Sequence, residues 1–352
     1  MSPRYVLVLA GGQGERFWPW STPERPKQLL PLARDGRSLL AATIDRALLL
    51  VPPANVLVLT SASLAGVVRR DYGASGVRVV GEPMMRNTGP AVGATAAWLL
   101  GQGADPAFAV FPADHAIDDR AAFAADLERG FAIAERDRVL VTFGVKPTHA
   151  ETNFGYIRSG ERISERLFRV AQFTEKPDLA RATEWVRSGR YLWNAGIFVW
   201  RAAVLLDALE AGRPALAGPL RGLARARDEH EFERGLADVF PGLESVSVDY
   251  AVLEPAPNAV MLEAAFDWDD LGSWSAWARR QPRDARGNVI FGEGVVLDCD
   301  NCVVVGDGGP AAALGLSDMV VVNANGATLA CRLAESNQVR RVSERVREGR
   351  GR

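Results

Sequence analysis

The sequence has few of the residues that build metal centres or disulfide frameworks. Of its 352 residues, 3 are cysteines and 3 are histidines. Three cysteines cannot make a disulfide framework, and a reducing cytosolic compartment fits best. Cys299 and Cys302 form a C-x-x-C in a Val-rich stretch, but zinc would need two more ligands, and Cys331 brings no histidine. We expect the paired thiols to pack in or near strands.

Excess charge of one sign and long apolar runs are also lacking. The formal net charge is -2, so no overall basic field attracts nucleic acid. The arginine-rich run 340–352 is interpreted as a solvated helix end or tail. No apolar stretch approaches the roughly 18 residues of a membrane span, and the run 5–10 is too short for a signal-peptide core. We therefore expect a cytoplasmic protein without nucleic-acid or membrane partners.

The sequence does contain a regular alternation of short apolar runs and helical patterns. Hydrophobic residues make up 48% and charged residues 24%, the balance of a globular protein of about two domains. Strands are predicted at 5–10, 55–60, 77–80, 107–111, 139–143, 168–173 and 197–200, and helices at 38–50, 89–100, 121–135, 179–188 and 202–211. Apolar strands alternating with helices predict a doubly wound, mostly parallel α/β sheet of Rossmann-like type.

The pattern changes after residue 284. Apolar doublets and triplets recur there about every 6 to 10 residues, divided by Gly, Asp and Asn, which is typical of short strands stacked in a small module. We predict a catalytic domain over residues 1–284 and a small C-terminal β-rich, β-helix-like domain with a basic tail over residues 285–352.

A glycine-rich turn follows the first predicted strand. Gly11, Gly12 and Gly14 could let backbone N–H groups approach a phosphate. The turn is not a Walker A loop, because no G-x-x-x-x-G-K-[ST] is present, and Phe17 occupies the sixth position of a dinucleotide fingerprint counted from Gly12. Alone, such a turn is as often structural as functional. Arg16 and Lys27 follow it between prolines, a combination that polyphosphate binding favours.

The residues around this turn resemble a known family. The stretch 9–19 reads L-A-G-G-Q-G-E-R-F-W-P, and P-K-Q follows at 26–28. Together they resemble the signature of the nucleotidyltransferases that make sugar nucleotides, and within these the mannose-1-phosphate guanylyltransferases, or GDP-mannose pyrophosphorylases. Blocks similar to the family's follow in its order over nearly the whole chain: E-P-M-M-R-N-T-G-P-A at 82–91, F-P-A-D-H at 111–115, F-T-E-K-P-D at 173–178, W-N-A-G at 193–196 and F-D-W-D-D-L-G-S-W at 266–274.

Three positions depart from the family pattern. Ala195 replaces a serine, Gly89 replaces an alanine, and N-F-G-Y at 153–156 stands where G-Y-G-Y is common. Because these positions lie near the implied sugar or base pocket, the identity of the sugar stays open here. The sequence has no stretch resembling the phosphomannose isomerase domain of some relatives, so we expect a monofunctional chain.

Two aspartates are candidates for a metal site. Magnesium needs only one or two carboxylates beside substrate phosphates and water. Asp114 follows a buried strand, and the resemblance implies that Asp114 and Asp270 are the Mg²⁺ ligands. Asp267 and Asp269 are alternatives, since a loop aspartate can instead form an Asx turn. His115 is interpreted as orienting Asp114 or as simply packed.

The implied reaction needs charge neutralisation rather than a general base. The second pKa of a phosphate monoester is about 6, so the sugar phosphate is largely dianionic at pH 7. The catalytic task is in-line positioning of two anions and stabilisation of the leaving pyrophosphate. The resemblance therefore implies four catalytic residues, of which Lys27 acts with the metal at the α-phosphoryl group and Arg16 on the outgoing phosphates; Asp114 and Asp270 complete the set.

The resemblance also implies two binding regions. The nucleotide-binding residues are Gly11, Gly12, Gly14, Arg16, Lys27, Asn87, Thr88, Pro112 and Ala113. The sugar-phosphate-binding residues are Gly155, Glu175, Lys176 and Asn194. Without the resemblance, E-K-P would be interpreted as an ordinary surface ion pair at a turn. Guanine as the base is implied by the family, and these side chains alone do not identify it.

We therefore predict a Mg²⁺-dependent enzyme that transfers GMP from GTP to mannose 1-phosphate, giving GDP-mannose and pyrophosphate. One alternative is a sibling nucleotidyltransferase that uses another nucleoside triphosphate or hexose 1-phosphate. Another is a catalytically silent, sugar-nucleotide-binding regulator, although the four intact catalytic residues speak against it. An NAD-dependent oxidoreductase is excluded by the missing sixth glycine. A homodimer is one assembly that the sequence leaves open.

Overall fold

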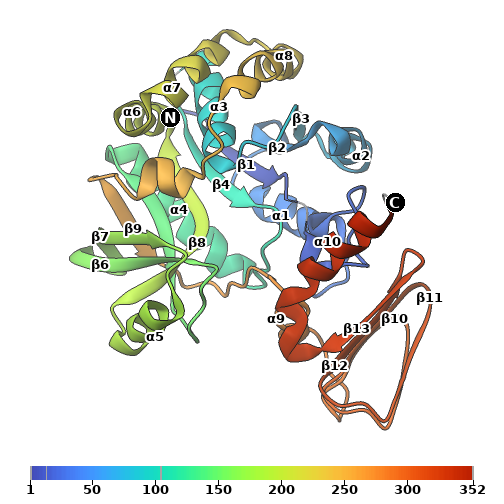
Figure 1. Cartoon of the computed structure of the whole chain (residues 1–352). Coiled ribbons are helices and arrows are strands. Elements are labelled where there is room, and N and C mark those ends of the chain that lie inside the picture. Colours follow the sequence, from blue (N-terminus) through green and yellow to red (C-terminus); the bar gives the residue numbers. More distant parts are fainter. Residues whose placement is uncertain (1, 13, 104, 351–352) are drawn as a thin grey trace. The chain divides into compact units, whose positions relative to one another are not determined.

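The structure is a computed structural model that describes residues 2–12, 14–103 and 105–350 (Figure 1). By its internal contacts the chain divides into two compact units. The first unit comprises Met1–Gly11, Thr43–Ala113 and Ile117–Trp268, and the second comprises Gly12–Ala42, Asp114–Ala116 and Asp269–Arg352. Each unit is therefore assembled from several separate segments of the sequence.

A large sheet forms the middle of the first unit. Within the described residues its strand order is β3-β2-β1-β4-β8-β5-β9-β7-β6. The strands are β1 (Arg4–Ala10), β2 (Val56–Ser61), β3 (Arg78–Glu82), β4 (Ala107–Pro112), β5 (Leu140–Val145), β6 (Gly155–Ser164), β7 (Leu167–Glu175), β8 (Tyr191–Arg201) and β9 (Ala259–Glu263). β1 pairs in parallel with β2 and β4, and β2 with β3. The predicted doubly wound, mostly parallel fold class is confirmed, with β8 inserted antiparallel between β4 and β5.

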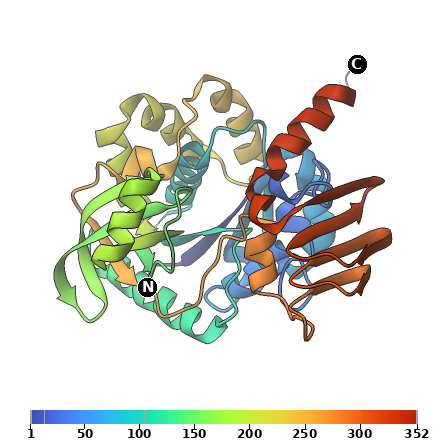
Figure 2. The same cartoon turned by 60° about the horizontal axis from the view of Figure 1, so that its bottom comes forward.

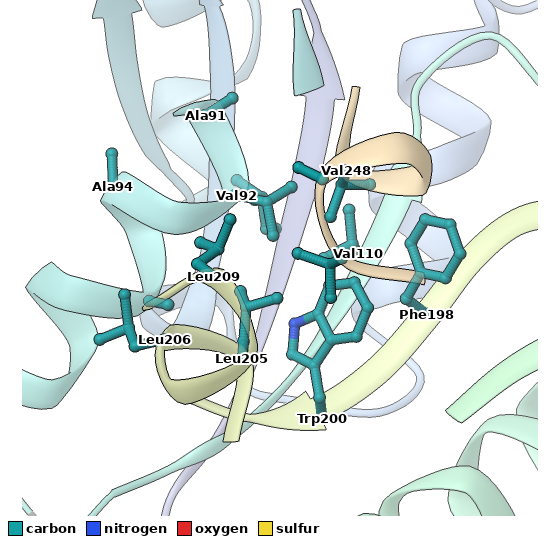
Figure 3. Close-up of a cluster of buried hydrophobic side chains, with 14 of the residues drawn as sticks. Ala91, Val92, Ala94, Val110, Phe198, Trp200, Leu205, Leu206, Leu209 and Val248 are labelled. Atoms are coloured by element: carbon teal, nitrogen blue, oxygen red, sulfur yellow. The ribbon is translucent and has the colours of Figure 1, made fainter. Parts of the chain in front are cut away.

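Helices cover both faces of this sheet. They are α1 (Leu39–Ala47), α2 (Ala62–Tyr72), α3 (Thr88–Gly101), α4 (Arg120–Arg136), α5 (Leu179–Ser188), α6 (Ala202–Gly212), α7 (Pro214–Arg221) and α8 (Glu229–Val239). Successive side chains of a strand point to opposite faces. Val110 of β4 packs into an apolar cluster with Val92 of α3 and Leu205 of α6 (Figure 3). Phe111 instead meets Phe123 of α4, with ring centroids 5.2 Å apart. Figure 2 shows α4 on the opposite side of the sheet from α6.

The second unit combines a small sheet with a tryptophan-rich core. Its strands are β10 (Val289–Leu297), β11 (Val303–Leu314), β12 (Met319–Ala324) and β13 (Ala327–Arg332), and its helices include α9 (Trp274–Arg279) and α10 (Val339–Arg350). β10, β11 and β12 pair in parallel, and β13 is antiparallel to β12. Trp20 stacks on Trp274 at 5.9 Å between ring centroids, and Trp277 packs edge-on against both.

The predicted β-rich character of the C-terminal segment is confirmed, with one difference. The apolar runs 289–290 and 295–297 belong to a single strand, β10, whose register shifts between Gly292 and Gly294. Cys299 and Cys302 are buried free thiols beside these strands, as expected. No helix among the described residues is long and apolar enough to cross a membrane.

Candidate active site

The glycine-rich turn is held by side chains that come later in the sequence. Gly14 has φ 61°, and a Cβ there would lie 2.3 Å from the Lys27 Cβ, so that both its backbone conformation and its surroundings require glycine. Gln28 Nε2 donates to the Gly12 carbonyl at 3.0 Å, and Ser21 Oγ donates to the Gly14 carbonyl at 2.8 Å. The turn is therefore packed directly against the segment that carries Lys27.

Lys27 connects the turn to the two predicted metal ligands. The residue is 6% exposed, although lysine is almost never fully buried without a partner. Its Nζ lies 2.9 Å from Asp114 Oδ2 and also donates to the backbone carbonyl of Asp270. Arg16 Nη1 donates to the Gly272 carbonyl at 3.3 Å, two residues beyond Asp270. The four predicted catalytic residues, from three distant parts of the sequence, thus meet within the second unit.

The two carboxyl groups have different electrostatic surroundings. Desolvation would raise the pKa of Asp114, but the Lys27 ammonium and His115 outweigh it and hold this pKa below its usual value. Burial raises the pKa of Asp270 to about 6; Lys27 opposes this shift, and Asp269 and Asp114 add to it. The repulsion between the carboxylates indicates a site where a further positive charge would be stabilised.

The other aspartates and the histidine of these motifs have further contacts. Asp270 itself also forms an Asx turn, since its Oδ1 accepts from the Gly272 N–H at 2.9 Å. Asp269 Oδ1 accepts from the Leu271 N–H at 2.9 Å, which is an Asx turn, and Asp269 Oδ2 meets Arg279. Asp267, in the first unit, accepts from the backbone N–H of residues 118 and 119. His115 Nε2 lies 3.9 Å from Asp114 Oδ1, beyond hydrogen-bond distance. Asp267 and Asp269 therefore hold loops together.

The four predicted sugar-phosphate residues lie together in the first unit. A Cβ at Gly155, the first residue of β6, would lie 2.6 Å from Glu175 Oε2 and 3.2 Å from Asn194 Cβ. Glu175, the last residue of β7, pairs with Lys176 Nζ at 2.9 Å. Lys176 has φ 49°, an unusual value for a residue with a side chain. Burial would lower the pKa of its ammonium, but Glu175 and Asp249 outweigh this and raise that pKa.

Asn194 is fixed by hydrogen bonds on both ends of its amide. It is 8% exposed, in the middle of β8. Its Oδ1 accepts from Thr142 Oγ1 at 2.9 Å and from the Gly196 N–H at 3.3 Å, and its Nδ2 donates to Asp249 Oδ1 at 2.9 Å. These bonds assign the orientation of the amide and leave one N–H without a partner among the described residues.

Asp249 is a residue of this group that the sequence did not indicate. It begins the short π-helix Asp249–Leu253, and burial, with the negative charge of Glu175 as the next cause, raises its pKa to about 7. The signal was weak because a single aspartate before the apolar run A-V-L is typical of a helix start. Its role depends on partners from β7 and β8, which only the folded chain brings near.

The remaining predicted residues gather at strand ends of the first unit. Gly11 follows β1, and Pro112 is the last residue of β4. The Ala113 N–H donates to the Leu9 carbonyl at 2.9 Å. Asn87 precedes α3 with φ 67°, and its Oδ1 accepts from the Thr88 N–H. In addition, Thr88 Oγ1 accepts from the Val248 N–H at 2.9 Å, which ties this block to the segment that carries Asp249.

Comparison with known proteins places this geometry in a family. Residues 5–286 match the family model described as nucleotidyl transferase, and residues 292–346 match that of a MannoseP isomerase/GMP-like beta-helix domain. The chain belongs to the nucleotidyl transferase family. It is 35% identical to the xanthan biosynthesis protein XanB of Xanthomonas campestris, covering 99% of this chain and 74% of that protein.

Other similar proteins agree with this assignment. The chain is 33% identical to the mannose-1-phosphate guanylyltransferase of Escherichia coli, over 97% of this chain and 74% of that one. It is also similar to a crystal structure described as mannose-1-phosphate geranyltransferase from Thermus thermophilus, with a TM-score of 0.87, 36% identity, and coverage of 98% and 99%. The resemblance predicted from the motifs is confirmed.

Nucleotidyl transferases generally use divalent cations, and the residues present fit one. Asp114 and Asp270 offer carboxylate oxygens, which are the ligands that Mg²⁺ prefers, in the number it needs when substrate phosphates supply the rest. No group of three or more His, Cys, Asp or Glu residues arranged for a metal occurs in the part of the chain that the structure describes. A site of two carboxylates therefore fits a cation that binds together with the nucleotide.

Proposed function

We propose that this chain transfers GMP from GTP to mannose 1-phosphate and releases pyrophosphate. The observation that carries the proposal is the contact of Lys27 with both Asp114 and Asp270 beside the glycine-rich turn. A relative that is 33% identical over 97% of this chain is named mannose-1-phosphate guanylyltransferase, which supports the choice of substrates. We also propose that the catalytic domain ends at residue 284, where the C-terminal domain begins, as predicted from the sequence. The proposed location is the cytoplasm.

The reaction is an in-line displacement at the α-phosphorus of GTP. A phosphate oxygen of the sugar phosphate forms a bond to that phosphorus, and the bond to the β-phosphate oxygen breaks as pyrophosphate leaves. Mg²⁺ held by Asp114 and Asp270 would supply positive charge at the α-phosphoryl group. Lys27 acts at the same group, Arg16 holds the leaving phosphates, and the backbone of Gly11, Gly12 and Gly14 approaches the triphosphate.

The four residues predicted to bind the sugar phosphate present charges of opposite sign to the two ends of mannose 1-phosphate. Lys176 meets the 1-phosphate, and Glu175 accepts from sugar hydroxyls. Asn194 donates its remaining N–H to a hydroxyl, and the absence of a side chain at Gly155 makes room for the carboxylate of Glu175. We assign Asp249 a positioning role, because it holds the amide of Asn194 at 2.9 Å.

We expect Asp249→Asn to stabilise the protein at pH 8 and to raise KM for mannose 1-phosphate. The pKa of Asp249 is about 7, above its usual value of 3.8, so the folded state binds this proton more tightly than the unfolded chain. The stability that this proton contributes is therefore lost as pH rises from about 4 to 7. Thermal unfolding at pH 5.5 and 8 should show a smaller decrease in Tm for Asp249→Asn than for the wild type. An equal decrease in both proteins would contradict a buried charge at this position.

Guanine recognition is supported by a buried carboxyl at the end of β3. Glu82 is 8% exposed, its Oε1 has no hydrogen-bond partner in the described part of the chain, and its Oε2 lies 3.4 Å from the position of a Cβ at Gly11. Burial raises the pKa of Glu82 to about 7. A carboxylate accepts hydrogen bonds only, and guanine presents two adjacent donors on its Watson–Crick edge. We assign Glu82, with Asn87, Thr88, Pro112 and Ala113, to the base side of the nucleotide.

The test is to combine four nucleoside triphosphates with several sugar phosphates. We expect pyrophosphate release only when both substrates and Mg²⁺ are present, with the highest kcat/KM for GTP and mannose 1-phosphate. Glucose, N-acetylglucosamine and fucose 1-phosphates are the competing sugars. A tenfold preference for another pair would identify a sibling nucleotidyltransferase, and binding without pyrophosphate release would identify a silent regulator.

Glu82→Gln is the matched variant for the base. Its amide replaces one acceptor oxygen by a donor, which would oppose a donor of guanine and leave the shape of the side chain unchanged. We expect the preference for GTP over ATP to fall by about tenfold or more, with little change in KM for mannose 1-phosphate. An unchanged preference would remove Glu82 from the base side.

A further inference from the structure

Helix α10 contacts the segment that follows Gly14, where two of its arginines meet Glu15. Glu15 lies between Gly14 and Arg16, and its side chain is 16% exposed. Arg340 Nε lies 3.0 Å from Glu15 Oε2, and Arg347 Nη2 pairs with Glu15 Oε1. The two arginines are separated by about two helical turns and so lie on one face of α10. Each carboxylate oxygen of Glu15 therefore has its own guanidinium.

This contact adds an anchored start to the expected solvated helix end. The first residue of α10, Val339, is 2% exposed and belongs to the apolar core of the second unit, together with Phe17 and Trp274. Since Val339 is held in that core, the helix is anchored where it begins. The described part of the run is otherwise largely solvated as expected. The side chains of Arg340 and Arg347 are 62% and 49% exposed, and that of Arg345 is 87% exposed and pairs with Glu348 of its own helix.

Glu15 lies directly beside the turn that is proposed to bind the triphosphate, so its ion pairs bear on nucleotide binding. A carboxylate next to a turn that binds a triphosphate would repel the substrate unless positive charge neutralised it. Exposed ion pairs stabilise little, but Glu15 is largely buried and accepts a charge-assisted hydrogen bond from Arg347. Arg340 adds a second positive charge 3.0 Å away, while its Nε donates to Glu344 of its own helix at 2.9 Å. Glu15 also begins the short 3-10 helix Glu15–Phe17, whose middle residue is Arg16. Whatever fixes Glu15 thus fixes the backbone that carries Arg16.

We propose that α10 is a clamp on the nucleotide loop, in which Arg340 and Arg347 position Arg16 through Glu15. The inference rests on the proposed function for its effect on GTP, but not for its effect on the loop. Arg340, Arg347 and Glu15 are positioning residues, since none of them touches the reacting atoms. The C-terminal module thereby acquires a role in substrate binding besides its own folding.

The experiment compares Arg340→Ala/Arg347→Ala and Glu15→Gln with Arg345→Ala as the control on the same helix. We expect the first two variants to raise KM for GTP by about tenfold and to leave KM for mannose 1-phosphate unchanged. Replacing both arginines by lysine should restore most of the affinity, because charge is kept. Arg345→Ala should behave as the wild type.

Hydrogen exchange without substrates provides a second measurement. Amides of residues 14–18 should exchange faster in the double alanine variant and in Glu15→Gln than in the wild type or Arg345→Ala. Unchanged exchange and unchanged KM for GTP in both variants would overturn the clamp. A wild-type protein that makes no GDP-mannose, but whose loop exchange still responds to the variants, would overturn the proposed function and leave the clamp in place.

Discussion

Asp114→Asn is expected to lower kcat by about a hundredfold or more, because it removes charge from a site that acts by positioning. Asp114 Oδ2 is the hydrogen-bond partner of Lys27 Nζ at 2.9 Å, so that the substitution weakens the metal site and also releases the ammonium that faces the α-phosphoryl group. Asp270→Asn should cause a loss of similar size. Both variants should need more Mg²⁺ for half-maximal activity.

Asp269→Asn is the matched control for this experiment. It changes the neighbouring residue in the same way, but Asp269 Oδ1 accepts from the Leu271 N–H, and an asparagine oxygen can do the same. We expect a mild effect on kcat and on the Mg²⁺ requirement. Steady-state kinetics at varied Mg²⁺ measure both quantities, and equal tolerance of Asp114→Asn and Asp269→Asn would remove Asp114 from the metal site.

The second large effect is expected at Lys27, which we contrast with Lys176. Lys27→Ala should lower kcat strongly, because charge builds on the α-phosphoryl group and the leaving pyrophosphate in the transition state. In the proposed site, Lys176 meets the 1-phosphate in both the ground and the transition state. Lys176→Ala should therefore mainly raise KM for mannose 1-phosphate, by about ten- to a hundredfold for a lost charge-assisted contact of about 1.5–3 kcal/mol.

Kinetics with each substrate varied in turn distinguish the two lysines. Lys27 is 6% exposed, so its removal also leaves Asp114 without its ammonium partner. Lys27→Met keeps much of the volume and checks that the effect comes from charge rather than from a cavity. If Lys176→Ala raised only KM for GTP, the assignment of the two substrate regions would be reversed.

Much of the fold could be predicted because periodicity reports burial directly. The apolar runs at 5–10 and 107–111 became the neighbouring strands β1 and β4, and the helix predicted at 179–188 matches α5. The pairing of β8 between β4 and β5 could not be predicted, since it depends on contacts between residues far apart in sequence. Helix α10 was not distinguished from a solvated tail, because its polar arginines hide a single buried valine, Val339.

The candidate site was predictable to the extent that its residues follow strands or belong to motifs. Arg16, Lys27 and Asp114 were predicted this way. In the structure Lys27 contacts Asp114, and Arg16 contacts the carbonyl of Gly272. Asp249 could not be identified, because it has no distinctive neighbour in the sequence. Glu15 lies within the glycine-rich motif, but the motif does not indicate its ion-pair partners. The surroundings of these two residues come from β8 in one case and from α10 in the other.

The fixed amide of Asn194 has a consequence for analogue chemistry. Its oxygen is used by Thr142 and Gly196, and one of its hydrogens by Asp249, so the only group it can offer a sugar is a donor. A ring substituent at that point must accept a hydrogen bond, and it need not give one. With Asn194 at the sugar as proposed, we expect fluorine, a weak acceptor, to be better tolerated there than hydrogen, and an ammonium group to be rejected. The proposed site thus predicts that the hydrogen-bond pattern of this one side chain restricts which sugar phosphates are accepted.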